Sequence, residues 1–458
     1  MCGTSRSRRR RSSAGVRRSA RSTFRTRPRG PLNDVAATQH GEWALTLLQL
    51  QSALGLLALT TLAWALGGFH RCTPWRVVAA GLGLQILFAA ALLHIPPLRA
   101  AFALLGRAVD ALATATRAGT SFVFGYLGGG PLPFAEPFPG AGFILFFQGL
   151  PLVLVVGALA AVLYHWRVIP VIVEALARLL TRAFGLGGAA GFATAANVFV
   201  GMVEAPLLVR PWLARLSISE MFVVMTAGLA TIAGNMLVVY AVMIAPVVPD
   251  AAGQLLTASL ISAPAAVLVA LLMRPGDAAP VVEQAATAPR LYDSTMEALV
   301  RGTQDGLTLL LGIMATLVVF VALVALLNMV LEPLTGLTLQ RICAVLFWPL
   351  AFAMGIPAES AGTVAASLGT KVVVNEFVAY LELAQSGGLG LSERSRLILI
   401  YALCGFTNFA SVGIMLGGMV AMCPERRADI VKLGLPALVA ATIACCMTGA
   451  VVGLLTAP

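Results

Sequence analysis

The sequence predicts an all-α integral membrane protein with about eight transmembrane helices and two oppositely oriented re-entrant hairpins. Of the 458 residues, 59% are hydrophobic and 11% are charged, whereas a soluble domain carries about 25% charged residues. Apolar runs of about 20 residues, enough to cross about 30 Å of hydrocarbon, recur along nearly the whole chain. In addition, two long apolar connections are interrupted by Gly, Pro and polar residues in a similar order. Lipid must therefore be the solvent for most of the chain.

The first segment, residues 1–41, contains eleven arginines and one acidic residue, Asp34. It has no apolar stretch, so it is not a secretion signal, and its composition predicts a disordered tail. Such a tail could contact anionic lipid or nucleic acid. We favour the simpler interpretation, a solvated tail or an over-long gene start, and expect no nucleic-acid partner.

Eight apolar runs follow the tail, and each is assigned as a transmembrane helix. They are residues 43–69, 77–95, 141–164, 221–244, 255–272, 307–330, 397–420 and 435–455. The expected domains are residues 42–140 (N-terminal spans and an interfacial helix), 141–274 (span three, the first hairpin and the first repeat) and 275–456 (span six, the second hairpin and the second repeat).

The orientation follows from the loops, because Lys and Arg favour the cytoplasmic side. Three connections are basic, namely those between spans one and two, three and four, and seven and eight; the last contains CPERR. The PDAAG link between spans four and five has no basic residue. These four connections agree if the basic ones are cytoplasmic, which places both chain ends outside. The arginine-rich tail conflicts with this orientation, because it is basic and would lie on the outer side.

Two connections, residues 165–217 and 331–396, are too long and too apolar for ordinary loops. Each holds a broken apolar stretch rich in small residues, GGAAGFATAANVFVGMVEAPLLV and MGIPAESAGTVAASLGTKVVVNEFVAYLEL. Non-helical backbone at membrane depth is tolerated only where it is packed in protein or lines a cavity. We therefore interpret both connections as re-entrant hairpins.

The two hairpins belong to a repeat. Glu204 precedes Ser217 and an interrupted span, GLATIAGN, and Glu376 precedes Ser392 and another interrupted span, CGFTNFAS. Three spans separate the hairpins, and since this number is odd, the second copy enters the membrane from the opposite face. An inverted repeat with interrupted helices is the architecture of a secondary transporter.

Polar residues in the hairpins are the candidate site, because ionisable residues at membrane depth are costly and usually functional. Taken alone, Glu204 could be neutralised by Arg210, and Asn197 could cap a helix. The second copy repeats the polar insertion with Glu376, which favours a function. Two carboxylates suit hydrogen bonds from the hydroxyl or amide groups of a polar solute. Lys371 either balances Glu376 or binds a substrate oxygen.

The interrupted spans add further groups. Gly228, Gly234 and Asn235 disfavour a continuous helix, and Asn197 with Thr231 could supply oxygen ligands for a hard monovalent cation.

In the second interrupted span, Asn408 and Ser411 are three residues apart and should share a helix face. Phe406 offers a ring to stack on a planar ligand. Together with the two carboxylates, these groups suggest a sugar joined to a flat ring.

The motifs NVFVGMVEAPLLVRPWLARLSISEMFVVMTAGLATIAGN, GTKVVVNEFVAYLEL, YALCGFTNFASVGIMLGG and CPERR occur in this order. Together they resemble the concentrative nucleoside transporters over about residues 140–455. The resemblance implies a multi-pass protein of the bacterial inner membrane, a homotrimer whose substrate domain moves like an elevator. It implies uptake of nucleosides with Na⁺ or, in some members, H⁺, and no cofactor.

Matched to the family's motifs, the ribose-binding groups are Glu376, Asn408 and Ser411, with Phe406 and Met236 near the base. The implied sodium ligands are the Asn197 side chain, the Val200 and Ile232 carbonyls and the Thr231 hydroxyl.

The chain departs from the family in one stretch, Gly201-Met202-Val203-Glu204, where members usually have Gly-Gln-Thr-Glu or Gly-Gln-Ser-Glu. The missing amide and hydroxyl would read the edge of the base, so ordinary nucleoside preference is in question. Met202, Val203 and Glu204 still belong to the expected substrate site.

Other classes fit less well. An enzyme needs a nucleophile–base pair or a metal cluster, and the four His and seven Cys residues show no such spacing. A proton-coupled carrier of a non-standard nucleoside-like solute remains the alternative, as does a non-transporting channel or receptor that uses the same fold.

Overall fold

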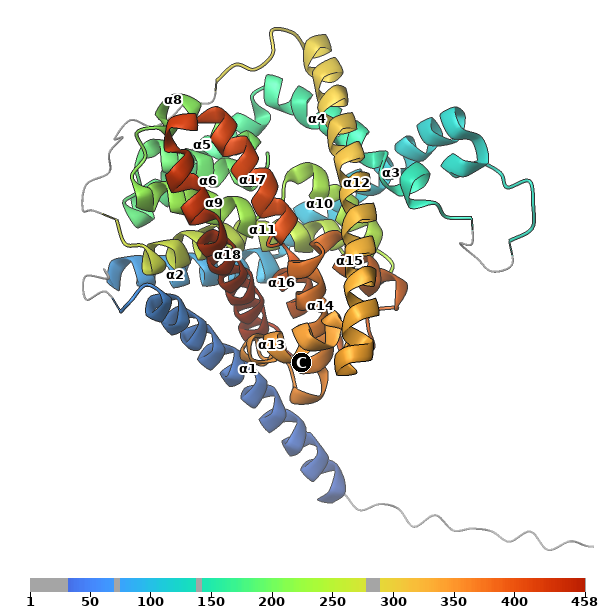
Figure 1. Cartoon of the computed structure of the whole chain (residues 1–458). Coiled ribbons are helices and arrows are strands. Elements are labelled where there is room, and N and C mark those ends of the chain that lie inside the picture. The colour runs from blue at the N-terminus through green and yellow to red at the C-terminus, as the bar shows by residue number, and fades with distance from the viewer. Residues whose placement is uncertain (1–31, 70–74, 137–141, 277–288, 458) are drawn as a thin grey trace, which may run out of the picture. The chain divides into compact units, whose positions relative to one another are not determined.

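The computed structural model describes residues 32–69, 75–136, 142–276 and 289–457, and every regular element in these ranges is helical. The chain divides into two units, Met1–Ala44 and Leu45–Pro458, and the description below concerns the second (Figure 1). The α-helices are α1 (Leu32–Leu66), α2 (Trp75–His94), α3 (Pro96–Phe124), α4 (Leu152–His165), α5 (Val168–Phe184), α6 (Gly188–Asn197), α7 (Glu204–Leu208), α8 (Arg210–Leu213), α9 (Ile218–Ala230), α10 (Gly234–Ile244), α11 (Ala251–Met273), α12 (Thr295–Thr335), α13 (Leu339–Ala353), α14 (Ala358–Val373), α15 (Glu376–Gln385), α16 (Glu393–Leu403), α17 (Phe409–Met422) and α18 (Arg427–Leu455).

Seven of the predicted spans correspond to helical segments that are long and apolar enough to cross a membrane. Within the described residues these are Leu47–Leu66, Trp75–His94, Leu145–His165, Ile218–Ile244, Ala251–Met273, Thr295–Thr335 and Pro424–Leu455. The remaining predicted span, residues 397–420, is divided between α16 and α17, which are separated at residues 404–408. The helices α13 and α14 would pass the same test as a pair, but they are bent by 120° relative to each other.

The N-terminal segment expected to be disordered falls mainly outside the described residues. Residues 32–41 of that segment are helical, because α1 begins at Leu32.

Both re-entrant hairpins are present. The first consists of α6 followed by α7 and α8, and the second of α14 followed by α15. Each is preceded by a further helix that we did not predict, α5 in the first case and α13 in the second. After each hairpin the next helix begins at a serine cap: the hydroxyl of Ser217 accepts a hydrogen bond from the backbone of Glu220, and that of Ser392 from Ser395. Such caps satisfy helix-end donors that would otherwise lack partners.

The contacts of α18 show that the two copies are inverted. Near the start of α18, Arg426 donates to the carbonyl of Leu216, next to the start of α9. Near the end of α18, Arg394 at the start of α16 donates to the carbonyls of Gly453 and Thr456. Since α9 and α16 occupy equivalent places in the repeat, the two copies run in opposite directions along α18.

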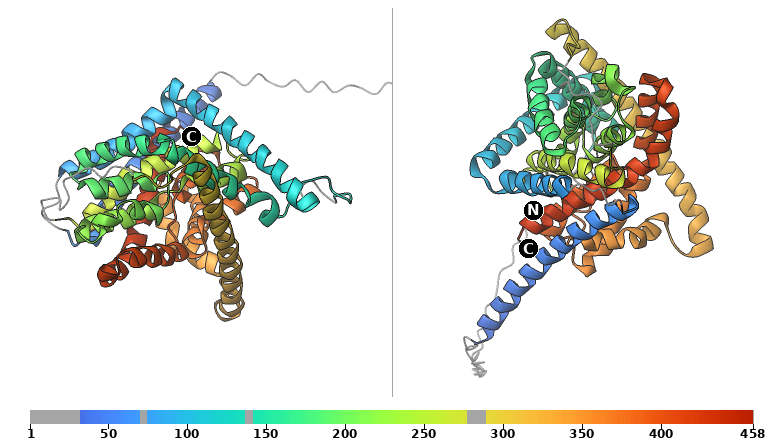
Figure 2. Two further views of the ribbon diagram at one scale, coloured as in Figure 1. Left: turned by 90° about the horizontal axis from the view of Figure 1, so that it is seen from above. Right: turned by 90° about the vertical axis from the view of Figure 1, so that its left-hand side faces the viewer.

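The inner and outer helices differ in burial. The most apolar windows of Ile218–Ile244 and Ala251–Met273 are each 83% buried, whereas that of α12 is 11% buried. Figures 1 and 2 show α12 along the outside of the unit. It packs closely on α4, where an ideal Cβ on Gly302 would lie 2.7 Å from the carbonyl oxygen of Gly157. Small residues commonly allow such close helix packing in membranes.

Candidate substrate and ion site

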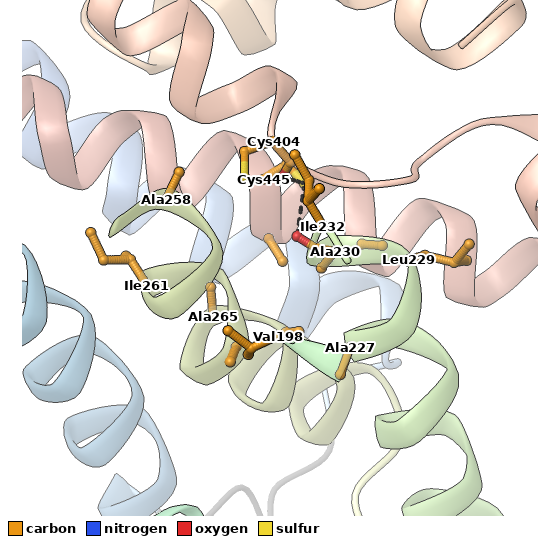
Figure 3. Packing of buried hydrophobic residues seen from close by; sticks show 14 of the residues in the cluster. Val198, Ala227, Leu229, Ala230, Ile232, Ala258, Ile261, Ala265, Cys404 and Cys445 are labelled. Atoms are coloured by element: carbon orange, nitrogen blue, oxygen red, sulfur yellow. Dashed lines mark hydrogen bonds between the residues drawn. The ribbon is translucent and has the colours of Figure 1, made fainter. Parts of the chain in front are cut away.

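The two interrupted spans meet at their breaks. The carbonyl of Ala230, which ends α9, accepts a weak hydrogen bond from the thiol of Cys445 in α18 at 3.6 Å. The same thiol lies 3.3 Å from the carbonyl of Cys404, which follows α16. Figure 3 shows Cys404, Cys445, Ala230 and Ile232 gathered at this place. Gly405, at φ +146°, leaves no room for a side chain beside Ala230.

Glu376 is the best-defined polar group in this region. It is the first residue of α15 and is 4% exposed. Its Oε1 accepts a 2.7 Å hydrogen bond from the hydroxyl of Tyr240 in α10, and its Oε2 accepts a 2.8 Å bond from Nδ2 of Asn408. The carboxylate is therefore held between elements of both repeats, with lone pairs left to accept further hydrogen bonds.

Tyr240 was not identified from the sequence. Its ring lies 4.9 Å from that of Tyr380 and 5.9 Å from that of Phe377, both in α15. The hydroxyl of Tyr380 donates to the carbonyl of Ile400 in α16. These rings fix α15 against α10 and α16, and hence fix the position of Glu376. The available signal was a lone tyrosine four residues after Met236 on the same helix face.

Asn408 is the N-cap of α17, and Ser411 lies in the first turn. The Oδ1 of Asn408 accepts a 2.7 Å hydrogen bond from the backbone of Ser411. The helix starts only after Asn408, so Asn408 caps the first turn in which Ser411 lies. Both residues are buried, while Phe406 is partly exposed. The capping bond also fixes which end of the Asn408 amide faces Glu376.

Lys371 has a role that the sequence left open. Its ammonium group, 1% exposed, donates a 2.8 Å hydrogen bond to the carbonyl of Ala402 near the end of α16. Among the described residues Lys371 forms no salt bridge with Glu376. In this structure the lysine therefore stabilises the broken end of a helix.

In the first repeat, Asn197 and Thr231 lie together. The hydroxyl of Thr231 is 3.2 Å from the backbone carbonyl of Asn197 and 2.9 Å from that of Ala227. The amide nitrogen of Asn197 donates to Val224, but its buried Oδ1 has no hydrogen-bond partner within the described part of the chain. A buried oxygen without a partner is unusual, and it fits a cation ligand.

The other two expected ligands are near this pair in sequence. The Ile232 carbonyl lies in the break after α9 and is 3.4 Å from the hydroxyl of Ser259. Val200 lies at the tip of the first hairpin, and the preceding carbonyl, that of Phe199, accepts a bond from Gly234. The hairpin tip thus contacts the first residue of α10.

The glycines of the first interrupted span do not themselves make the break. Gly228 lies inside α9, and Gly234 and Asn235 lie in α10, while the break comprises residues 231–233. Gly228 instead permits close approach: an ideal Cβ there would lie 3.1 Å from Cβ of Met202 and 3.4 Å from Oδ1 of Asn197.

The hydrophobic pair at the first hairpin tip contacts two helices. Met202 faces Gly228 of α9, and Val203 faces Gly418 of α17, where an ideal Cβ would lie 2.8 Å from Cγ1 of Val203. Glu204 is exposed, and its carboxylate lies next to Gly201, which has φ +130°. Met236 is 4% exposed.

The inverted repeat, the two hairpins and the polar groups at facing helix breaks define a secondary transporter rather than an enzyme. Comparison with known families agrees. Residues 54–127 match the sequence model of the Na⁺-dependent nucleoside transporter N-terminus, residues 146–247 a nucleoside-recognition "gate" model, and residues 254–453 the transporter C-terminus. The chain belongs to the concentrative nucleoside transporter family.

Curated proteins are similar to this chain over most of its length. An uncharacterized transporter of Haemophilus influenzae is 36% identical, covering 88% of this chain and 97% of its own. The nucleoside permease of Helicobacter pylori is 32% identical, covering 88% and 97% respectively. The sodium/nucleoside cotransporter 1 of mouse is 34% identical over 90% of this chain, which spans 64% of the mouse protein.

Solved structures agree in fold. CNTnw in an inward-facing substrate-bound state is 33% identical, with a TM-score of 0.81, covering 88% of this chain and 98% of that chain. An outward-facing form of CNTnw carrying two substitutions gives a TM-score of 0.79 at 32% identity, covering 89% and 97% respectively. The fold class expected from the sequence is confirmed.

Proposed function

We propose that this protein is a symporter that takes up nucleosides or related ribosides together with Na⁺. The observation that carries the proposal is the buried carboxylate of Glu376, fixed by Tyr240 and Asn408 beside the helix breaks. Burying a charge at membrane depth is costly, and the hydroxyl groups of a ribose would add hydrogen bonds to it. Names such as sodium/nucleoside cotransporter among the relatives support the same substrate and ion.

Each expected residue has a place in this proposal. Glu376, Asn408 and Ser411 bind the ribose, and Phe406, Met236, Met202 and Val203 lie on the side of the base. Glu204 contributes the second carboxylate. Na⁺ is bound by the Asn197 side chain, the Thr231 hydroxyl and the Val200 and Ile232 carbonyls. The Oδ1 of Asn197, which has no hydrogen-bond partner among the described residues, supports this ion site.

Uptake into proteoliposomes tests the proposal. Labelled nucleosides should accumulate against a gradient when Na⁺ is outside, and a sodium ionophore should abolish the accumulation. Uptake that is equal in Na⁺ and choline but driven by external acid would favour a proton-coupled carrier. Equilibration without accumulation would favour a channel, and binding without flux a receptor.

The substitution Thr231→Val should raise the Na⁺ concentration needed for half-maximal uptake. It removes the hydroxyl and retains the shape of the side chain, so the protein should stay folded. The loss of one neutral oxygen ligand should weaken sodium binding about tenfold, as for a bond of about 1.5 kcal/mol to a charged group. The matched control is Thr442→Val, because Thr442 lies in α18 outside the proposed ion site and its hydroxyl donates to the carbonyl of Leu438 in the same helix. An unchanged sodium dependence in Thr231→Val would remove this residue from the ion site.

The double substitution Met202→Gln with Val203→Thr should tighten the binding of ordinary nucleosides. An apolar wall discriminates by only about 1–3 kcal/mol, whereas groups that bond to the base reject analogues more strongly. Thr has nearly the shape of Val, so the contact with Gly418 should persist. The gain should be larger for bases with an intact hydrogen-bonding edge than for analogues without one.

Equilibrium binding to the purified protein measures this effect, with Leu207→Gln as the control. Leu207 belongs to the same hairpin and is 47% exposed. If parent and double mutant bind both sets of ligands equally, these two positions do not face the base.

We further propose a homotrimer in the bacterial inner membrane, with lipid covering its outer helices. The exposed apolar side chains of α12, such as Val318 at 65% and Leu326 at 58%, support contact with lipid or a neighbouring subunit. The domain boundaries 42–140, 141–274 and 275–456 are part of the same proposal. Native mass spectrometry would determine the oligomeric state.

A further inference from the structure

A cavity lies away from the helix breaks. It has a volume of about 1170 Å³ and is formed where the end of α1, the start of α9, the end of α11 and the first part of α18 come together. Its lining includes Ser217 and Ser219 as well as two arginines, Arg274 and Arg426. None of the expected substrate or ion residues lines it.

The guanidinium groups in this cavity keep unused donors. The side chain of Arg274 lies over the ring of Phe222 at 5.7 Å and forms no hydrogen bond or ion pair with any described residue. Arg426 donates through Nε to Asp429 and through Nη1 to the carbonyls of Ala214 and Leu216, which leaves Nη2 without a described partner. Asp429 offsets the charge of Arg426, whereas Arg274 has no ion-pair partner among the residues that the structure describes.

The two serines contribute fewer donors to a ligand, because their hydroxyls already donate to protein oxygens. That of Ser217 donates to the buried carboxylate of Glu220, and that of Ser219 donates to the carbonyl of Arg274. A ligand of this cavity would therefore be recognised by the arginines. Guanidinium groups pair well with phosphate oxygens.

The wall of the cavity is apolar and open. Leu66, Leu435, Val439 and Ile218 are 51%, 61%, 44% and 39% exposed, respectively. A small soluble anion would not cover these side chains, whereas the acyl chains of a lipid would. The arginines beside them would contact the headgroup.

The charge pattern of the chain places this cavity on the cytoplasmic side. Three of the four segments that form it adjoin the connections that are rich in Lys and Arg, and the fourth, the end of α11, lies one span beyond the uncharged PDAAG link. Anionic lipids give the cytoplasmic leaflet its negative potential, and basic pockets between helices on that side bind their headgroups.

We propose that this cavity binds one phospholipid with an anionic phosphodiester headgroup. Arg274 and Arg426 bind the phosphate, and the acyl chains lie on Leu66, Leu435 and Val439. Because α1, α9, α11 and α18 all contribute, the lipid would hold these helices together at their cytoplasmic ends.

Native mass spectrometry of the full chain in detergent tests the proposal, with phosphatidylglycerol and phosphatidylcholine as probes. We expect one phosphatidylglycerol per chain to be retained in preference to phosphatidylcholine. Arg274→Gln should weaken phosphatidylglycerol binding about fivefold, the effect of about 1 kcal/mol per basic residue near a membrane surface. Arg427→Gln is the matched control, because Arg427 is exposed, follows Arg426 at the start of α18 and does not line the cavity.

Two further measurements distinguish a bound lipid from a bound soluble anion. Leu435→Gln should weaken the binding of phosphatidylglycerol without creating affinity for glycerol 3-phosphate. If inorganic phosphate or glycerol 3-phosphate displaces the lipid at equal concentration, the site binds a soluble anion and the proposal is wrong. Equal retention of both lipids, or equal effects of Arg274→Gln and Arg427→Gln, also overturns it. Melting curves in phosphatidylcholine check that each variant is folded.

Discussion

Replacing Glu376 by Gln should lower the affinity for nucleosides about ten- to a hundredfold. A hydrogen bond to a charged group contributes about 1.5–3 kcal/mol, and the substitution removes the charge while it keeps the shape. The fold should tolerate the change, because an amide can satisfy both neighbours. The Oε1 of Gln can accept from Asn408, and its NH₂ group can donate to the hydroxyl of Tyr240, which can reverse its role from donor to acceptor.

The orientation of the new amide is determined by Asn408. Its own amide cannot turn over without losing the 2.7 Å bond to the backbone of Ser411 that caps α17. The Gln carbonyl must therefore face Asn408, which leaves less acceptor capacity for a ribose. Tyr240→Phe, which removes one donor and keeps Glu376 charged, should have a smaller effect.

Isothermal titration with ribosyl and deoxyribosyl nucleosides measures the effect. Glu382→Gln serves as the control, since Glu382 is an exposed carboxylate of the same helix. Identical binding of both ligand sets to parent and Glu376→Gln would show that Glu376 does not contact the ribose.

The transmembrane helices and hairpins could be predicted from the sequence because their signal is a sum over many residues. About 20 consecutive apolar residues are needed to span the hydrocarbon, so single polar insertions do not hide a span. The hairpins carried a second signal, the recurrence of Glu and Ser at similar distances. Helices α5 and α13 were not separated from the hairpins, because their apolar residues are continuous with them in the sequence.

The site could be predicted only in part, because its contacts join distant residues. Glu376 and Asn408 were found as polar residues in apolar segments, but Tyr240 is 136 residues from Glu376 and is an ordinary aromatic residue of a helix. The arrangement of Asn408 and Ser411 depended on where α17 begins, and sequence patterns rarely fix a helix end to one residue. The role of Lys371 was not decided because its partner is a backbone carbonyl, which has no signature in the sequence.

Arg394 is a further residue that the sequence did not single out. It lies at the start of α16, is 3% exposed and contacts five oxygen atoms: four backbone carbonyls, of Leu48, Gly355, Gly453 and Thr456, and the hydroxyl of Ser52. No described carboxylate pairs with it. The carbonyls come from α1, from the turn between α13 and α14, and from the end of α18. Arg394 thus links three elements that are far apart in the sequence.

Replacing Arg394 by Met should destabilise the protein on the order of 3 kcal/mol, taking about 0.6 kcal/mol for each of five interhelical bonds in a membrane protein. Met fills a similar volume, so the loss reflects hydrogen bonds rather than a cavity. The stability of Arg394→Lys should lie between those of the parent and Arg394→Met, because an ammonium group has three donors and cannot reproduce the planar guanidinium.

The melting temperature in detergent measures this effect, with Arg396→Met as the matched control. Arg396 lies two residues further along α16 and is partly exposed. A similar melting temperature for Arg394→Met and Arg396→Met would show that the bonds of Arg394 do not stabilise the fold. If instead only Arg394→Met melts early, binding of phosphatidylglycerol to the folded protein should still resemble that of the parent. The lipid cavity lies at the other end of α18, so the two clusters should contribute independently to stability.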